Sequence, residues 1–350
     1  MRTSPLTLGS LTLDTPVLAA PIAGFTDSIF RHIVRDLGGC GLLFTEMIGA
    51  SPWVHGGLDP SRLQGVEGEA RPLGVQLWDR DPDMIREAAR RLADLRVSVI
   101  DLNFGCPKKR IMGRHAAGAA LLRDPATVGQ LVRAAVEGSG GIPVTAKIRL
   151  GASLAARTAP EVARAAEANG AVAITVHGRM ADQNYDVPCY LDMIGEVVRA
   201  VSVPVIANGD VRDAASALRT LQSTGAAGVM VARGALTRPW VFREITAALR
   251  RQPIPDPPTP QAQKALLLRH HAAMVERDGD PWGTVMMRKF ACRYLSGLPG
   301  GRTFRDAITR AEDSADFRAV VERHFPLDSS DPPAPINPMF AGEPCASSCP

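Results

Sequence analysis

The stretch VIDLNFG, residues 99–105, predicts a β-strand with one apolar and one polar face. Successive side chains of a strand point to opposite sides, and the apolar ones fall together: Ile100, Leu102 and Phe104. Asp101 and Asn103 fall on the other side. The corner that follows the strand holds Cys106 and then a basic run: Lys108, Lys109 and Arg110.

Two later stretches repeat this alternation, PVTAKIRLG at 143–151 and AITVHGR at 173–179. In each, the polar positions share one strand face: Thr145, Lys147 and Arg149, then Thr175, His177 and Arg179. Three other candidate strands add polar groups near their ends: Glu46, Gln76 and Asn208. The interior of a strand barrel is normally filled by branched apolar side chains. Polar groups recurring there predict a functional site, and a self-satisfied set of buried polar groups is the structural alternative.

Eight such strands alternate with helix-forming segments: 16–23, 42–47, 72–78, 99–105, 143–151, 173–179, 204–210 and 228–234. Asp81 as an N-cap and Pro82 in the first turn predict a helix over 81–96. The alternation predicts a (β/α)8 TIM barrel. A doubly wound open sheet is the rival fold, but no Gly-x-Gly-x-x-Gly turn follows the first strand.

The length of 350 residues allows one large domain and a small second one. We expect the barrel over 1–250, a proline-rich linker over 251–263, a small all-helical domain over 264–325 and a disordered tail over 326–350.

In the predicted helical domain, Met287, Phe290 and Tyr294 recur at helical spacing and predict a packed face. Basic residues lie beside that face: Arg288, Lys289 and Arg293. From 269 to 310, Lys and Arg outnumber Asp and Glu. The region could therefore lie on RNA phosphates, and an exposed helix face balanced by carboxylates is the alternative.

The overall charge of +4 does not by itself indicate a nucleic-acid partner. The six cysteines lack the spacing of a disulfide framework and no Cys/His set completes a zinc site, so we expect a reducing cytoplasm and no metal. No apolar run reaches transmembrane length. We expect a monomer that does not bind a membrane.

Small residues end the last two strands, in ANGD at 207–210 and VARGAL at 231–236. This end of a barrel commonly binds phosphate through backbone N–H groups, which favours a phosphate-bearing cofactor. Lys147 points inward and could hold an anionic ring, form a Schiff base as in aldolases, or pair with Asp101.

His177 and Arg179 share a strand face but lack the partners of a metal site, so they favour hydrogen bonding to a ligand over metal binding. A satisfied core histidine is the alternative. The Cys106 thiol, with an ordinary pKa of roughly 8.5, is mostly protonated at neutral pH and can donate a proton.

Ten segments between about residues 15 and 312 together resemble the tRNA-dihydrouridine synthases, flavin enzymes that reduce uridine in tRNA. They are APIAGFTDSIFR, TEM, GVQL, LNFGCPKKR, GAALLRDP, VTAKIRLG, TVHGR, ANGD, GVMVARGALTRPW and MRKFACRYLSGLPG. The resemblance implies an FMN barrel, NADPH (or NADH) as reductant and a helical tRNA-binding domain.

The resemblance also implies roles for individual residues. Cys106 becomes the general acid, and Asn103 and Arg179 lie near the target uracil. The basic run after Cys106 and the three basic residues of the helical domain meet tRNA. The implied FMN contacts are Pro21, Ile22, Ala23, Gln76, Lys147, His177, Asn208, Gly209, Asp210, Ala232 and Arg233.

Two features depart from the family pattern. Ala232 stands where a glycine is usual, and MADQNYDVPCY at 180–190 matches poorly. Two other functions compete with the resemblance: another FMN barrel such as a dihydroorotate dehydrogenase, and a tRNA-binding protein without catalysis. A small pyrimidine substrate needs no basic helical domain, which disfavours the first.

Overall fold

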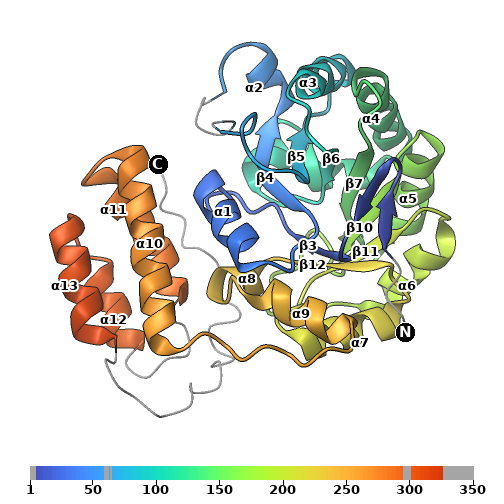
Figure 1. Cartoon of the computed structure of the whole chain (residues 1–350). Coiled ribbons are helices and arrows are strands. Elements are labelled where there is room, and N and C mark those ends of the chain that lie inside the picture. Colours follow the sequence, from blue (N-terminus) through green and yellow to red (C-terminus); the bar gives the residue numbers. More distant parts are fainter. Residues whose placement is uncertain (1–4, 59–62, 64, 295–300, 326–350) are drawn as a thin grey trace. The chain divides into compact units, whose positions relative to one another are not determined.

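The computed structural model describes residues 5–58, 63, 65–294 and 301–325. Eight parallel strands form one sheet in the order β3-β12-β11-β10-β7-β6-β5-β4. A bridge between Leu18 and Leu42 joins the two edge strands, and Ala19 N–H donates to Leu42 O at the same seam (2.9 Å). The sheet thus closes on itself, which confirms the predicted (β/α)8 barrel (Figure 1).

The barrel strands are β3 (Val17–Ala19), β4 (Leu43–Gly49), β5 (Leu73–Trp78), β6 (Val99–Phe104), β7 (Val144–Arg149), β10 (Ala173–His177), β11 (Val205–Asn208) and β12 (Gly228–Val231). The longer barrel helices are α1 (Ser28–Leu37), α3 (Pro82–Asp94), α4 (Pro125–Gly138), α5 (Ala159–Ala168), α6 (Leu191–Ala200), α7 (Ala214–Thr224) and α9 (Val241–Leu249). Figure 1 shows helices such as α3, α4 and α5 on the outside of the strands. The predicted start of α3 is confirmed, because Asp81 accepts from the N–H groups of Asp83 and Met84.

Shorter elements precede or lie between these strands and helices: β1 (Leu6–Leu8), β2 (Leu11–Leu13), α2 (Ala50–Val54), the π-helical turn η2 (Arg110–Arg114), the 3-10 turn η3 (Gly118–Arg123), β8 (Gly151–Ser153), β9 (Ala156–Arg157) and α8 (Arg233–Thr237). The predicted strand 143–151 is shorter than expected. β7 ends at Arg149, and the chain turns into the β8–β9 hairpin at Gly151, whose φ is +147°.

An apolar cluster fills the inside of the barrel at the amino ends of the strands. It combines side chains of the β1–β2 hairpin with those of the barrel strands: Leu6, Leu8, Leu13, Leu18, Phe44, Val99, Ile206 and Met230. Val99 begins β6 and shares its strand face with Asp101 and Asn103. The predicted inward polar groups therefore lie above this cluster, towards the carboxyl ends of the strands.

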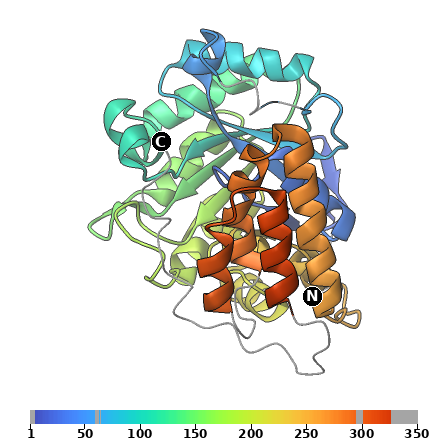
Figure 2. The same cartoon turned by 90° about the vertical axis from the view of Figure 1, so that its left-hand side faces the viewer.

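The chain divides into two compact units, and the second comprises residues 184–186, 235–240 and 255–350. Its helices are α10 (Pro260–Asp278), α11 (Trp282–Tyr294), α12 (Gly301–Ile308) and α13 (Ser314–His324), which pack side by side (Figure 2). The predicted packed face of α11 is confirmed, because its three members are 0–3% exposed: Met287, Phe290 and Tyr294.

The predicted linker 251–263 was too long at its carboxyl end. Thr259 accepts from Ala262 N–H and Pro260 occupies the first turn, so α10 begins inside that range. The predicted disordered tail, 326–350, lies outside the described residues. Among the described residues, no helix has both the length and the apolar character that a membrane span needs.

Candidate active site

The polar groups predicted from strand parity gather at the carboxyl ends of neighbouring strands. Strand pairing aligns Asn103 of β6 with Lys147 of β7, and His177 of β10 with Asn208 of β11. On the other side of β6, Gln76 of β5 aligns with Asp101. The structure therefore brings together side chains that are up to 132 positions apart in the sequence, Gln76 and Asn208.

Cys106 sits on the corner after β6, and its backbone is held from both sides. Its N–H donates to Asn103 Oδ1 (2.9 Å), and its carbonyl accepts from Ala119 N–H in η3 (3.0 Å). Gly118 allows this approach, because a Cβ there would lie 2.8 Å from the Cys106 carbonyl oxygen. Burial raises the pKa of the half-buried Cys106 thiol, so the thiol stays protonated at neutral pH.

Lys147 is the inward cation of the site. Burial lowers the pKa of its ammonium to about 8, although nearby Asp101 opposes the shift. Burial raises the pKa of the Asp101 carboxyl to about 6. Within the described part of the chain, the Lys147 ammonium makes no hydrogen bond or ion pair, so the predicted alternative of a direct Lys147–Asp101 pair is not formed. A partly buried cation without such a bond fits an electron-rich ligand.

His177 is held neutral beside a buried arginine. Burial lowers the pKa of its imidazole, and surrounding cations, Arg149 first, lower it further. Arg179 Nη1 lies 3.2 Å from His177 Nε2, and since a guanidinium can only donate, Nε2 is the acceptor. Arg179 is 1% exposed and also donates to Val187 O (2.6 Å) and to Asp210 (2.7 Å). These bonds give Arg179 a supporting role, and its predicted contact with uracil stays a prediction.

The predicted phosphate-binding residues lie at the ends of the two adjacent strands β11 and β12. Asn208 Nδ2 donates to Met230 O (2.9 Å), which ties the two strand ends together. The Asp210 carboxylate accepts from Arg233 (3.0 Å) as well as from Arg179. Gly209 has φ +114°, and a Cβ there would lie 2.3 Å from Cys189 Sγ, so this turn requires glycine.

The loop after β3 adjoins this region and carries the remaining predicted cofactor contacts: Pro21, Ile22 and Ala23. Ala20 N–H donates to Val231 O (2.8 Å), which places the loop beside Ala232. Thr26 Oγ1 accepts from Ile22 N–H (3.0 Å) and closes the loop on itself.

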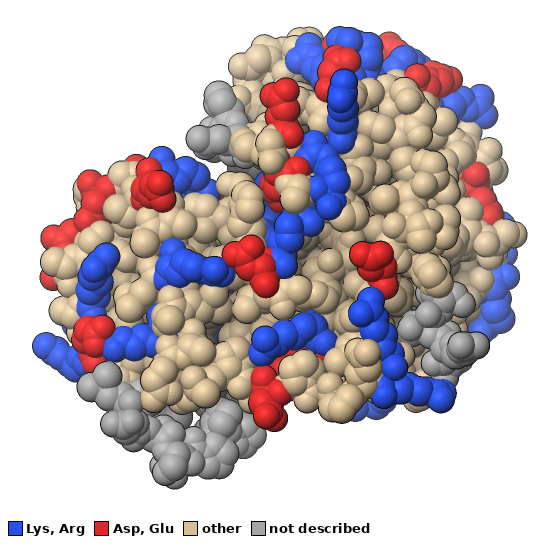
Figure 3. Space-filling model, viewed as in Figure 1, with Lys and Arg blue, Asp and Glu red and all other residues tan. Residues whose placement is uncertain are grey.

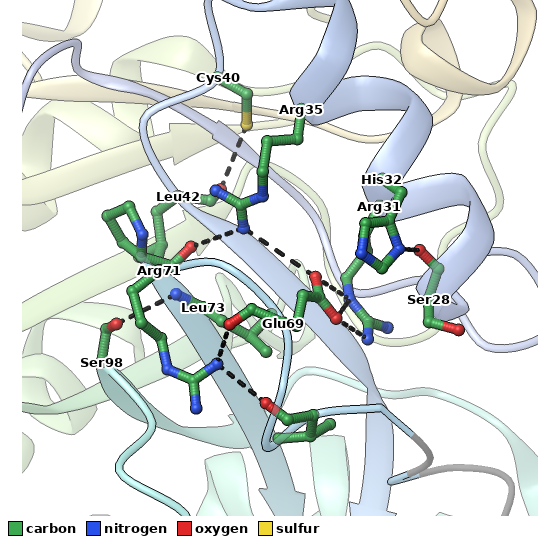
Figure 4. Close-up of polar contacts among 12 residues, drawn as sticks. Ser28, Arg31, His32, Arg35, Cys40, Leu42, Glu69, Arg71, Leu73 and Ser98 are labelled. Carbon is green, nitrogen blue, oxygen red and sulfur yellow. Dashed lines mark hydrogen bonds and ion pairs between the residues drawn. The ribbon is translucent and has the colours of Figure 1, made fainter.

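A buried ion pair between Arg31 and Glu69 also supports that loop, and Figure 4 shows the pair. Arg31 donates through Nη1 to Thr26 O (2.7 Å) and through Nη2 to Glu69 (2.5 Å). The Glu69 carboxylate lies between Arg31 and Arg35, and the side chains of Arg31 and Glu69 are 2% and 0% exposed. Sequence reasoning missed this pair, because 38 residues separate its members and Glu69 lies outside the segments that resemble the family.

Arg149 is a second residue whose function the sequence did not reveal. Its parity predicted an inward position, and its guanidinium donates to Met180 O (2.6 Å) and Gln183 O (3.3 Å). Arg149 and Arg179 therefore anchor segment 180–190, which departs from the family pattern. Both arginines donate to backbone carbonyl oxygens of this segment. Relatives with other side chains in the segment can therefore keep the same two anchors.

The predicted RNA-contacting residues divide into two groups. Three are exposed on the corner after β6: Lys108, Lys109 and Arg110. On α11, Arg288 donates to Ala311 O (2.8 and 2.6 Å) and so has a structural role, while Lys289 and Arg293 are half-buried. On the face shown in Figure 3, Lys and Arg are interspersed with Asp and Glu.

Comparison with known proteins identifies the family. The family model described as dihydrouridine synthase matches residues 17–328. The chain is 37% identical over 324 residues to tRNA-dihydrouridine synthase B of Pseudomonas aeruginosa, covering 92% of this chain and 96% of that protein. It is 38% identical over 323 residues to a probable tRNA-dihydrouridine synthase of Rhodobacter capsulatus, covering 91% and 98%.

A solved structure supports the fold alone. Histamine dehydrogenase from Rhizobium sp. 4-9 superimposes with a TM-score of 0.55 at 12% identity, covering 77% of this chain. The match spans half of that protein's length. The family match extends from the first barrel strand to beyond α13, the last of the described helices, and this chain therefore belongs to the dihydrouridine synthase family.

Proposed function

We propose that this protein reduces the carbon 5–carbon 6 double bond of uridines in tRNA, with FMN as cofactor and NADPH as reductant. The observation that carries the proposal is the position of Cys106 on the corner after β6, where Asn103 accepts its backbone N–H and Lys147 of the neighbouring strand aligns with Asn103. The family membership supports the substrate class.

The barrel mouth fits a flavin phosphate ester. Lys147 offers a cation to the ring system, and Gln76 and His177 offer uncharged hydrogen-bonding groups. The turn at Gly209 and the half-exposed guanidinium of Arg233 would hold the phosphate, by backbone N–H groups and by charge. When bound, reduced FMN supplies a hydride.

The protein's own groups supply the proton that must follow the hydride. Adding a hydride to carbon 6 places negative charge on the uracil ring, and carbon 5 then needs a proton. Cys106 holds that proton because burial keeps its thiol neutral. Among the described residues, one N–H of Asn103 meets only the weak acceptor Met47 Sδ (3.5 Å), so that N–H is suited to orient a uracil carbonyl.

The target base must leave its stack to enter the barrel mouth. We propose that Lys108, Lys109 and Arg110, with Lys289 and Arg293 of the helical unit, bind the phosphates of the tRNA. Their exposed or half-buried positions allow such contacts.

The direct test is product formation. The purified protein with FMN is incubated with tRNA transcribed without modifications, and dihydrouridine is measured by mass spectrometry with NADPH or NADH. We expect dihydrouridine at specific positions and faster turnover with NADPH. A protein that leaves tRNA unchanged but interconverts dihydroorotate and orotate would instead be the competing FMN barrel enzyme.

A further inference from the structure

Four buried side chains on three neighbouring strands form a row of hydrogen bonds that ends at the Cys106 corner. Thr145 Oγ1 donates to Asp101 Oδ1 (2.7 Å), and Gln76 Nε2 donates to Asp101 Oδ2 (2.6 Å). Asn103 Nδ2 donates to Gln76 Oε1 (2.8 Å), and Asn103 Oδ1 accepts the N–H of Cys106. These side chains are between 1% and 8% exposed, so water does not substitute freely for any member.

The row can run in only one direction. A backbone N–H can only donate, so Asn103 must present its oxygen to Cys106 and its NH₂ to Gln76. Gln76 must then present its oxygen to Asn103 and its NH₂ to Asp101. An ionised carboxylate can only accept, so Asp101 at the far end requires the same orientation of both amides. The constraints at the two ends of the row therefore require the same orientation of the Gln76 and Asn103 amides.

We infer that Asp101 is a positioning residue that fixes the orientation of Gln76 and Asn103 and thereby holds Cys106 in place for proton donation. The inference rests on the proposed function of Cys106. Asp101 acts through two amides and reaches no reacting atom itself. Without its oxygen, the Gln76 amide can rotate, Asn103 loses its partner, and the Cys106 backbone loses its hold from Asn103 while it keeps the bond from Ala119.

Two substitutions distinguish the orienting role of Asp101 from any effect of its negative charge. The Asp101→Asn variant keeps an oxygen for Gln76, because the Thr145 hydroxyl can accept from the new NH₂ group. The Asp101→Leu variant removes the oxygen and keeps a similar branched shape. Both variants lose the charge near Lys147, so effects of charge on the cofactor should be equal in the two proteins. Asp101→Ala serves as a smaller replacement if the leucine variant does not fold.

The test is a double-mutant cycle with Cys106→Ala. The rate of uridine reduction is measured with the flavin reduced beforehand, and flavin content and flavin reduction are measured separately. We expect Asp101→Leu to slow uridine reduction by about 10- to 100-fold relative to Asp101→Asn, the scale of a misplaced catalytic group. In the Cys106→Ala background, the difference between Asp101→Leu and Asp101→Asn should largely disappear, because there is no thiol left to position.

A second readout does not depend on activity. Alkylation of Cys106 by iodoacetamide, followed by mass spectrometry, should be at least several-fold faster in Asp101→Leu than in wild type, and unchanged in Asp101→Asn. Equal behaviour of the two Asp101 variants, or a loss that multiplies with that of Cys106→Ala, would overturn the inference. Absence of dihydrouridine with the wild-type protein would instead refute the proposed function, and the alkylation comparison would still decide the role of Asp101.

Discussion

The proposed chemistry depends on the close approach of Gly118 to Cys106. Gly118 has φ +60°, a conformation that disfavours other residues, and its α-carbon faces the Cys106 carbonyl. The contact lets η3 approach closely enough for Ala119 to hold the corner. Gly113 lies five positions earlier, and no described residue comes within 4 Å of a Cβ added there.

We predict that Gly118→Ala displaces Cys106. The free energy of unfolding should fall by about 1–2 kcal/mol from the left-handed conformation alone. Uridine reduction should slow by roughly 10-fold or more because the thiol moves, while flavin reduction stays within experimental error. Denaturant titration and single-turnover kinetics measure these effects, and Gly113→Ala is the matched control. If both glycine variants behave alike, the close approach of η3 is not needed for catalysis.

Lys147 gives the cofactor site a predicted pH dependence. Below pH 8 its ammonium carries the positive charge, and above about 8 that charge is lost. The affinity for FMN should therefore weaken as the pH rises through about 8. Lys147→Met should lower the affinity by about 10-fold or more at pH 7, the value of one charge-assisted hydrogen bond, and should remove this pH dependence.

Fluorescence titration of FMN between pH 6.5 and 9 measures the effect. Lys264→Met is the control, because that lysine pairs with Glu322 in the helical unit. Unchanged FMN affinity in Lys147→Met across this range would remove Lys147 from the cofactor site.

At the scale of residues, strand parity predicted the inward side chains but not their partners. The alternation in 99–105 was sufficient to place Asp101 and Asn103 on the inner face of β6. It could not predict that Gln76 lies between them in a hydrogen-bonded row. That arrangement depends on the register of β5 against β6, which is a property of two strands and not of either sequence alone.

At the scale of elements, the Arg31–Glu69 pair connects α1 to the segment that leads into β5. Arg31 also holds the loop after β3, because its Nη1 donates to the Thr26 carbonyl. Removing one member of such a pair leaves a buried charge without its partner, which costs far more than losing an exposed pair. The exposed pairs of Glu87 with Arg90 and Arg91 on α3 offer the comparison.

We predict that Glu69→Ala lowers the free energy of unfolding by about 3–5 kcal/mol, because Arg31 stays buried without its carboxylate. The variant should also bind FMN more weakly than Glu87→Ala does, since the loop after β3 loses its support. Thermal denaturation and FMN titration of both variants test this. Similar stability of the two variants would show that the buried pair contributes little.

The order of elements was more predictable than their ends. Eight separate apolar runs with intervening helix signals were enough for the barrel, because each run is short and bounded by turn residues. The β8–β9 hairpin was missed, since the close pairing of its strands depends on Gly151, where an added Cβ would lie 2.2 Å from Ala156 O. α10 began earlier than predicted because its proline belongs to the first helical turn and not to the linker.

At the scale of the whole molecule, the proposal assigns chemistry to the barrel unit and tRNA contacts to both units. Each unit has its own packed core, so the two contributions can be changed independently. Phosphate contacts are recognised by their salt dependence, because binding releases counterions from the nucleic acid.

We predict that Lys289→Ala with Arg293→Ala weakens tRNA binding and lowers its salt slope by roughly one unit per lost phosphate contact. FMN content and NADPH oxidation should not change, because both positions lie on α11. Lys264→Ala, on α10 of the same unit, is the control for a general loss of positive charge. Equal tRNA affinity across a salt series would place the RNA elsewhere.

The central claim is that Cys106 donates a proton to uracil and does not take part in reduction of the flavin. The most direct measurement follows the two half-reactions of Cys106→Ala separately in a stopped-flow instrument. The account predicts flavin reduction by NADPH at the wild-type rate, and reduction of uridine in tRNA slower by about 100-fold or more, the scale of a positioned acid. Equal slowing of both half-reactions, or uridine reduction at the wild-type rate, would contradict the account.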